Sequence, residues 1–179
     1  MSKPKEQEPR KIVLIGLDNS GKTSILLSLQ GTTNILSFFS LKPTLGLNII
    51  KIEEEGKEYT IWELGGQQKY RKKYLEDLDK YTQGADEVIF VIDVQATDRY
   101  ELALQYLADI FRQLKKDEIE FSIYFHKFDP DLEKIKRFST EQITSILRNR
   151  INSIIPPDYN YEIFKTTIYT IFQKTQLNG

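Results

Sequence analysis

The amino-acid sequence predicts an α/β fold: a doubly wound sheet of six strands, one of them antiparallel at the edge, with about five helices. The first observation is a set of three apolar runs, at Lys11 to Gly16, Glu87 to Asp93 and Phe121 to His126. None alternates strictly in polarity, which is typical of strands buried on both faces of a parallel sheet. The second observation is helical periodicity between these runs, and the third is a hairpin-like segment.

Helical periodicity covers four segments: Lys22 to Leu29, Arg99 to Leu114, Thr140 to Ile154 and Thr167 to Gln176. Ser139 and Gln142 form a capping box that predicts where the third of these helices begins. In the second helix the periodicity is carried by Leu102, Tyr106, Ala108 and Phe111.

The hairpin-like segment consists of Leu47 to Glu54 and Lys57 to Leu64, which alternate in polarity on either side of Glu55 and Gly56. We expect these two strands to pair antiparallel at the edge of the sheet. Together with the helices, they predict the order β-α-β-β-α-β-α-β-α-β-α. A sheet of this kind binds its ligand at the carboxyl ends of the strands.

Composition limits the classes of function. The 179 residues suit one domain, which we expect to span 11–179 after a flexible lead-in at 1–10. With 25 Lys and Arg against 26 Asp and Glu, no overall field attracts nucleic acid or an anionic membrane. No cysteine and a single histidine exclude disulfides and Cys or His metal clusters. A cytoplasmic protein without a transmembrane segment or a lipid anchor is therefore expected.

A phosphate-binding motif lies between the first strand and the first helix. Its residues are Gly16, Leu17, Asp18, Asn19, Ser20, Gly21, Lys22 and Thr23. The pattern G-x-x-x-x-G-K-[ST] lets backbone N–H groups face the phosphates, with the lysine on the β/γ-phosphates and the threonine hydroxyl on Mg²⁺. The following helix directs its positive end at the same anion. The alternative, a glycine turn with a surface lysine, does not explain the strand and helix on either side.

A second group of residues suits the metal and the γ-phosphate. Glu63 ends the hairpin near the expected Mg²⁺, Gly66 can bring its N–H against a γ-phosphate, and Gln67 can orient an attacking water. Thr44 lies in a proline-restricted loop and is expected to reach the metal only when a γ-phosphate draws the loop in. The alternative is an acidic residue before an ordinary Gly-Gly turn.

The base pocket is expected directly after a buried strand. Asp129 can accept both adjacent donors of guanine, N1–H and N2–H₂, and adenine lacks that pair. Lys127 is expected to lay its aliphatic stem along the base, and His126 to lie on the base side. Thr166 and Thr167 either offer backbone N–H groups to guanine O6 or form an ordinary helix cap.

The order of these motifs resembles the Ras-superfamily small GTPases over nearly the whole chain. The segments 16–23, 43–48 and 62–67 resemble the Arf family, in which the hairpin shifts register when GTP replaces GDP. The segments 93–94, 126–129 and 165–169 resemble the Rag GTPases instead. Such a mixture is similar to Arf-related GTPases of archaea close to the eukaryotic lineage.

Three departures from the family pattern bear on function. The family usually has Asp where this chain has Glu63, and the extra methylene moves the carboxylate by about 1.5 Å, which affects the water-mediated contact with Mg²⁺ expected of this residue. Residues 1–10 do not supply the amphipathic, myristoylated helix with which Arf proteins begin. The chain stops at Gly179, before any Rag-type dimerisation domain, so a monomer is expected.

The sequence thus predicts a GTP-dependent switch that binds Mg²⁺ with GTP or GDP and orders the loops around 32–46 and 65–81. Hydrolysis is expected to be slow because the phosphate loop and first switch contain no arginine to neutralise the transition state. An exchange factor, an activating protein and effectors are the expected partners. Arg71 is interpreted as a solvated charge in the run 69–73, and this run as part of a mobile switch helix rather than an RNA site.

Two rival interpretations remain. The first is a scaffold module that holds GTP or GDP but barely hydrolyses it because Glu63 mispositions the metal. The second is another phosphate-loop class, a nucleoside monophosphate kinase or an ATPase, in which the motif His126-Lys127-Phe128-Asp129 has no role.

Overall fold

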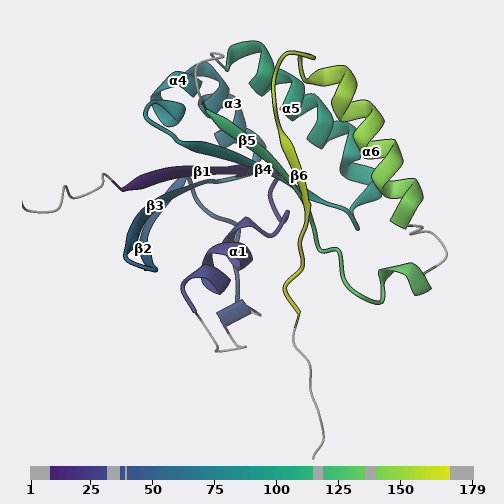
Figure 1. Cartoon of the computed structure of the whole chain (residues 1–179), viewed down its shortest axis with the longest axis horizontal. Helices are drawn as coiled ribbons and strands as arrows, with labels where there is room; N and C mark the ends of the chain where they lie inside the picture. The colour runs from purple at the N-terminus through teal and green to yellow at the C-terminus, as the bar shows by residue number, and fades with distance from the viewer. Residues whose placement is uncertain (1–8, 32–36, 39, 115–118, 136–139, 170–179) are drawn as a thin grey trace, which may run out of the picture.

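The computed structural model describes residues 9–31, 37–38, 40–114, 119–135 and 140–169. A six-stranded sheet in the order β2-β3-β1-β4-β5-β6 forms its centre (Figure 1). The strands are β1 (Arg10–Gly16), β2 (Leu47–Glu54), β3 (Lys57–Leu64), β4 (Glu87–Asp93), β5 (Glu120–His126) and β6 (Glu162–Lys165). β2 pairs antiparallel with β3 at the edge, and all other neighbours are parallel. The predicted fold class and its antiparallel edge strand are confirmed.

Five α-helices lie in the described part of the chain. They are α1 (Lys22–Leu29), α3 (Gln68–Glu76), α4 (Leu78–Thr82), α5 (Tyr100–Gln113) and α6 (Thr140–Ile154). Short 3₁₀ turns cover Thr97–Arg99 and Leu132–Lys134. α1 lies on one face of the sheet, whereas α3, α4, α5 and α6 lie on the other (Figure 1). The sheet is therefore doubly wound.

The ends of the chain differ from the sequence prediction in two respects. Arg10, assigned to the lead-in, is the first residue of β1 and pairs with Tyr59. The helix expected at 167–176 does not begin at Thr167, because residues 166–169 have no helical structure. Residues 170–176 and the capping box at 139–142 fall outside the described residues or their described side chains.

Two separate hydrophobic clusters explain why the parallel strands read as continuous apolar runs. Alternate residues of β1 face opposite sides, so Val13 and Ile15 join the cluster that packs α5 and α6, while Leu14 joins the cluster around α1. In β4, Phe90 lies in the first cluster and Ile89 in the second. Both faces of these strands are buried, so polar residues are excluded from both.

The buried side of α5 differs from the predicted one. Leu102, one of the positions that carried the periodicity, is 42% exposed. The residues of α5 that are buried are Ala103, Leu104, Tyr106, Leu107 and Ile110. Because apolar residues occupy neighbouring positions of α5, more than one face of the helix could be buried, and packing against the sheet determines which face is.

The β2–β3 hairpin turns through Glu55 and Gly56, whose φ angles of 52° and 74° are both left-handed. Two consecutive left-handed residues form the tight turn that matches the twist of the strands, and the ladder continues to the pair Glu54 and Lys57.

The parallel strands end at one edge of the sheet, so the loops that follow β1, β3, β4, β5 and β6 meet there. These loops and the ends of the strands and helix beside them contain every site residue predicted from the sequence except Thr44, which lies in the segment before β2. Within the described ranges, no helix is both long and apolar enough to cross a membrane.

Candidate functional site

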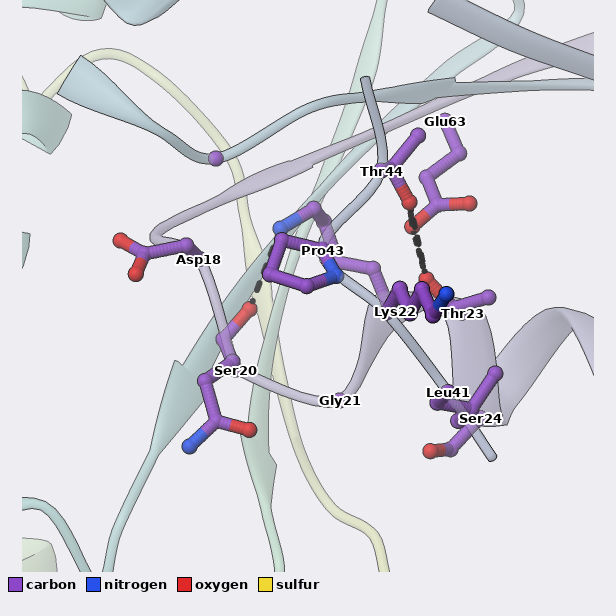
Figure 2. Close-up of a pocket in the computed structure, with 13 residues that line it drawn as sticks. Asp18, Ser20, Gly21, Lys22, Thr23, Ser24, Leu41, Pro43, Thr44 and Glu63 are labelled. Carbon is purple, nitrogen blue, oxygen red and sulfur yellow. Dashed lines mark hydrogen bonds between the residues drawn. The ribbon is translucent and has the colours of Figure 1, made fainter. Parts of the chain in front are cut away.

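The loop between β1 and α1 borders a pocket of about 170 Å³ (Figure 2). Residues 18–24 line it from this loop and the first turn of α1, residues 41–44 line it from the segment before β2, and Glu63 and Gly66 complete it. α1 begins at Lys22, so its unpaired N–H groups and positive dipole end lie at the pocket. Gly16 and Leu17 do not line the pocket, and they contribute through their carbonyl groups instead.

The Lys22 ammonium is held inside the loop. Its Nζ atom donates to the carbonyls of Gly16 at 3.1 Å and Leu17 at 2.7 Å, and lies 3.4 Å from Ser20 Oγ. The residue is only 4% exposed, and this burial lowers the pKa of Lys22 to about 8. A cation with so little solvent is stabilised by any anion that enters the pocket.

Gly21 is required by its surroundings. Its φ of 97° is a conformation that side chains rarely adopt, and a Cβ atom there would lie 2.3 Å from Cδ2 of His126. The phosphate loop therefore packs directly on the imidazole of the predicted base-side residue.

Three oxygen donors from separate segments meet beside Lys22. Oγ1 of Thr23 donates to Oε1 of Glu63 at 2.5 Å, Oγ1 of Thr44 donates to the same oxygen at 2.9 Å, and the two hydroxyls are 3.1 Å apart (Figure 2). Nδ2 of Asn48 donates to the other carboxylate oxygen, Oε2, at 3.2 Å. Glu63 is 1% exposed, so hydroxyl and amide groups provide its polar contacts.

This oxygen set fits Mg²⁺. Magnesium prefers hydroxyl and carboxylate oxygens at about 2.0–2.1 Å in an octahedron, which places neighbouring ligands about 3 Å apart. The Thr23–Thr44 and Thr44–Glu63 distances of 3.1 and 2.9 Å match that spacing, whereas the 2.5 Å between Thr23 and Glu63 is shorter. All three were predicted as metal-side residues, with Glu63 acting through water. The described residues contain no group of three or more His, Cys, Asp or Glu side chains that could hold a metal alone. Phosphate oxygens would supply the remaining ligands.

The loop after β3 lies against the phosphate loop. Gly65 N–H donates to the Gly46 carbonyl at 2.9 Å, which connects the end of β3 to the start of β2. A Cβ atom on Gly66 would lie 2.1 Å from the backbone nitrogen of Asp18. Only glycine allows the two loops to approach this closely.

Gln67 and Arg71 lie at and just after the start of α3. Gln67 is half-buried at the N-terminus of α3 and does not line the pocket around Lys22. Arg71 was interpreted as a solvated charge, and that interpretation is wrong. Its Nε atom donates to the Gly66 carbonyl at 3.0 Å, and its guanidinium lies 5.2 Å from the ring centre of Tyr106 on α5. Arg71 therefore connects the first turn of α3 to the loop that contains Gly66, beside the pocket.

Lys127 connects the base side to the phosphate side. It has a left-handed φ of 61°, and its Nζ atom donates to the Asn19 carbonyl at 2.9 Å. The same ammonium pairs with Oδ2 of Asp93 at 2.7 Å. The loop after β5 is thereby attached to the phosphate loop and to the end of β4.

Asp129 is held at both carboxylate oxygens. Thr167 Oγ1 donates to Oδ1 at 2.5 Å, and Gln95 Nε2 donates to Oδ2 at 2.7 Å. The Thr167 hydroxyl thus connects the loop after β6 to the base side.

His126 and Thr166 form a buried link. Nδ1 of His126 lies 2.9 Å from Oγ1 of Thr166, and the histidine is 2% exposed. Burial, with the nearby Lys127 charge, lowers the pKa of His126 to about 4, so the ring is neutral at pH 7. The Thr166 N–H donates to the Phe125 carbonyl at 2.9 Å, so that group is already engaged and the guanine O6 role predicted for it is not available.

Two further residues at the site were missed by sequence reasoning. Gln95 contacts Asp129, and Arg99 clamps the phosphate loop by donating to the Asp18 carbonyl at 2.8 Å and to its carboxylate at 2.7 Å. Both follow β4 at the carboxyl edge of the sheet, and that position was the available signal.

Comparison with known proteins agrees with this geometry. The model of the ADP-ribosylation factor family, Arf, matches residues 1–174. Among solved structures, the chain is similar to the Arl6 (BBS3) small GTPase from Trypanosoma brucei with the bound nucleotide analogue GppNp. The TM-score is 0.66 at 23% sequence identity, over 89% of this chain and 87% of that chain, a likeness of fold. Because the family match covers nearly the whole sequence, this chain belongs to the ADP-ribosylation factor family of Ras-superfamily small GTPases.

Proposed function

We propose that this chain is a molecular switch that binds GTP or GDP with Mg²⁺ and slowly hydrolyses GTP to GDP and phosphate. Membership of the Arf family makes it a guanine-nucleotide-binding protein of the small-GTPase class. The observation that carries the finer proposal is the meeting of Thr23, Thr44 and Glu63, because these residues come from the phosphate loop, the first switch segment and the hairpin.

Each side of the site has a separate task in this proposal. The phosphate loop and Lys22 bind the phosphates, and Thr23, Thr44 and Glu63 hold the metal. A bound Mg²⁺ neutralises charge on the β- and γ-phosphates. Asp129 accepts the guanine donors, Lys127 covers the base, and Thr44 and Gly66 respond to the γ-phosphate.

In hydrolysis, a water oxygen forms a bond to the γ-phosphorus while the bond from the bridging oxygen to that phosphorus breaks. The electron pair stays on GDP, and the proton of the water passes to the released phosphate. Gln67 would orient the water after a movement of the loop between β3 and α3, since it does not line the pocket around Lys22. Arg71 and Arg99 are engaged by Gly66 and Asp18, which supports a slow intrinsic rate and an arginine supplied by an activating partner.

The partners would bind where the switch segments reach the surface. Leu45, in the segment before β2, is 74% exposed, and Ile49, near the start of β2, is 47% exposed. Exposed apolar side chains next to a loop that responds to nucleotide suit an effector or regulatory protein. We propose that the chain acts as a monomer in the cytoplasm and does not bind nucleic acid.

Equilibrium binding of GDP and ADP to the wild type and to Asp129→Ala tests the nucleotide class. We expect GDP to bind much more tightly than ADP to the wild type, and Asp129→Ala to lose that preference. Equal competition by ADP, or an unchanged GDP affinity in the variant, would overturn the assignment.

A scaffold module that binds nucleotide but barely hydrolyses it is the second candidate. The position of Gln67, which does not line the pocket around Lys22, favours it. Single-turnover hydrolysis by the wild type and Gln67→Leu distinguishes the two functions. A slower reaction in Gln67→Leu supports the enzyme, and equal rates support the scaffold.

A further inference from the structure

Gln95, on the loop after β4, makes three hydrogen bonds on the base side of the site. Its backbone N–H donates to Oδ1 of Asp93 at 2.9 Å. Its side-chain Nε2 atom donates to the Lys127 carbonyl at 2.8 Å and to Oδ2 of Asp129 at 2.7 Å. The side chain is half-buried, so these bonds are partly shielded from competing water.

The orientation of the Gln95 amide follows from its two partners. Both are oxygen atoms that only accept, and a flipped amide would direct Oε1 at two acceptors. Each hydrogen on Nε2 therefore has its own acceptor, one a backbone carbonyl and the other a carboxylate. The amide spans a fixed distance between the backbone of the motif and its acidic side chain.

The contact between Gln95 and Asp129 affects which base can bind, because it occupies one of the acceptor positions on the carboxylate. A carboxylate has about four lone-pair sites, two on each oxygen. Thr167 occupies one on Oδ1 and Gln95 occupies one on Oδ2. One site is left on each oxygen, which equals the number of adjacent donors on the guanine edge, N1–H and N2–H.

We propose that Gln95 is a positioning residue for guanine selectivity: with Thr167, it fixes the Asp129 carboxylate so that both free acceptor sites face the base. This rests on the proposed function, since it assumes that Asp129 reads guanine. Gln95 also connects base recognition to the phosphate loop. Asp93 accepts a hydrogen bond from the Gln95 backbone and pairs with Lys127, and Lys127 in turn donates to the Asn19 carbonyl.

The test compares GDP with inosine diphosphate, which lacks the 2-amino group, in the variant Gln95→Met. Methionine matches the length of glutamine but cannot donate to Asp129. Loss of a hydrogen bond to a charged group should weaken GDP binding by about tenfold or more. Inosine diphosphate presents one donor to the carboxylate instead of two, so we expect a smaller loss and a ratio of the two dissociation constants that moves toward one. Isothermal titration calorimetry measures both constants.

A matched control is available on α5. Gln105 Nε2 donates to Oδ1 of Asp109 at 2.9 Å, a glutamine–aspartate contact on the surface. Gln105→Met should leave both affinities and their ratio unchanged. If Gln95 only supports the loop, Gln95→Met would weaken both ligands by the same factor, and that equal loss would overturn the proposal.

A second variant keeps the inference testable if Gln95→Met does not fold, as judged by circular dichroism. Thr167→Val removes the donor on the other carboxylate oxygen and should move the same ratio in the same direction. An unchanged ratio in that variant counts against the inference. A wild-type protein with no preference for GDP over ADP contradicts the proposed function itself, whereas a wild type that prefers GDP with an unchanged ratio in Gln95→Met contradicts only the role of Gln95.

Discussion

At the scale of single residues, Glu63 joins three segments of the chain around the proposed metal site. Glu63 reaches the hydroxyls of Thr23 and Thr44 with one carboxylate oxygen, while its other oxygen accepts from Asn48. These contacts tie together the phosphate loop, the loop before β2 and the hairpin. Removal of the charge of this residue should therefore lower the affinity for Mg²⁺ more than it lowers the stability of the fold.

Glu63→Gln keeps the size of the side chain and removes its charge. Because loss of a residue that supports a metal typically costs about 10- to 100-fold in affinity, we expect the Mg²⁺ concentration needed to retain GDP to rise by at least about tenfold. The release of a fluorescent GDP analogue during a Mg²⁺ titration measures it. Glu58→Gln, an exposed position on the same strand, is the control. Equal Mg²⁺ dependence in Glu63→Gln and the wild type would contradict this role.

His126 makes stability dependent on pH. Its pKa is about 4 in the folded protein against 6.5 for an ordinary histidine, so the unfolded chain binds the proton more readily. The stabilisation is present above pH 6.5 and is lost as the pH falls toward 4. Between pH 7 and pH 4.5 this amounts to roughly 2 kcal/mol of unfolding free energy.

Urea denaturation at these two pH values measures the loss in the wild type and in His126→Asn, which has no group that titrates in this range. We expect the wild type to lose about 2 kcal/mol more than the variant between the two pH values. Carboxyl groups contribute equally to both proteins, so the difference isolates the histidine. Parallel losses in the two proteins would mean that His126 does not titrate in this way.

At the scale of elements, α5 illustrates how packing selects one side of an apolar helix. Leu107 is fully buried against the sheet, whereas Leu102 is 42% exposed although both are leucines of the same helix. Arg71 reaches Tyr106 on this helix, so α5 also supports the segment that carries Gln67. The helix therefore belongs both to the core and to the support of the site.

Leucine-to-alanine substitutions test which face of α5 is buried. Leu107→Ala leaves a cavity in the core and should lower the free energy of unfolding by about 2–5 kcal/mol. Leu102→Ala removes the same atoms from the surface and should change it by less than about 0.5 kcal/mol. Chemical denaturation of both variants measures the contrast, and similar losses would contradict the assignment of the buried side.

At the scale of the whole molecule, the site is assembled from the loops of five parallel strands and from the segment before β2. These segments are distant in sequence and meet only when the sheet is complete. Lys127, Asp93 and Arg99 then join the phosphate loop to the base side through hydrogen bonds. A ligand that occupies both sides should consequently bind the folded state and not the unfolded chain.

Ligand binding should therefore raise the stability of the entire domain. At a free GDP concentration 100 times its dissociation constant, linkage predicts about 2.7 kcal/mol of added stability, a rise in Tm of roughly 5–10 °C for a chain of this size. Differential scanning fluorimetry with Mg²⁺ measures the shift. ADP at the same concentration should give a much smaller rise, and Asp129→Ala should reduce the rise with GDP. An equal shift with ADP would contradict the assembled guanine site.

The sequence by itself determined the features that depend on local pattern. The strands buried on two faces, the hairpin and the phosphate loop follow from hydrophobic runs, alternation and glycine spacing, and the structure contains each of them. The sequence also led to the prediction that Glu63 and Thr44 lie on the metal side, because magnesium prefers oxygen donors. It likewise predicted that Asp129 binds the base, because guanine has two adjacent donors.

Only the tertiary structure decided which side chains hold those residues in place. The contacts of Gln95 with Asp129, Arg99 with Asp18, and Arg71 with Gly66 join different segments. The first two join residues that are 34 and 81 positions apart in the sequence, and local periodicity or motif spacing does not predict contacts between residues so far apart. The same reason accounts for the buried side of α5. Local pattern limits which residues can be buried or bound, whereas packing across the sheet selects the contacts that form.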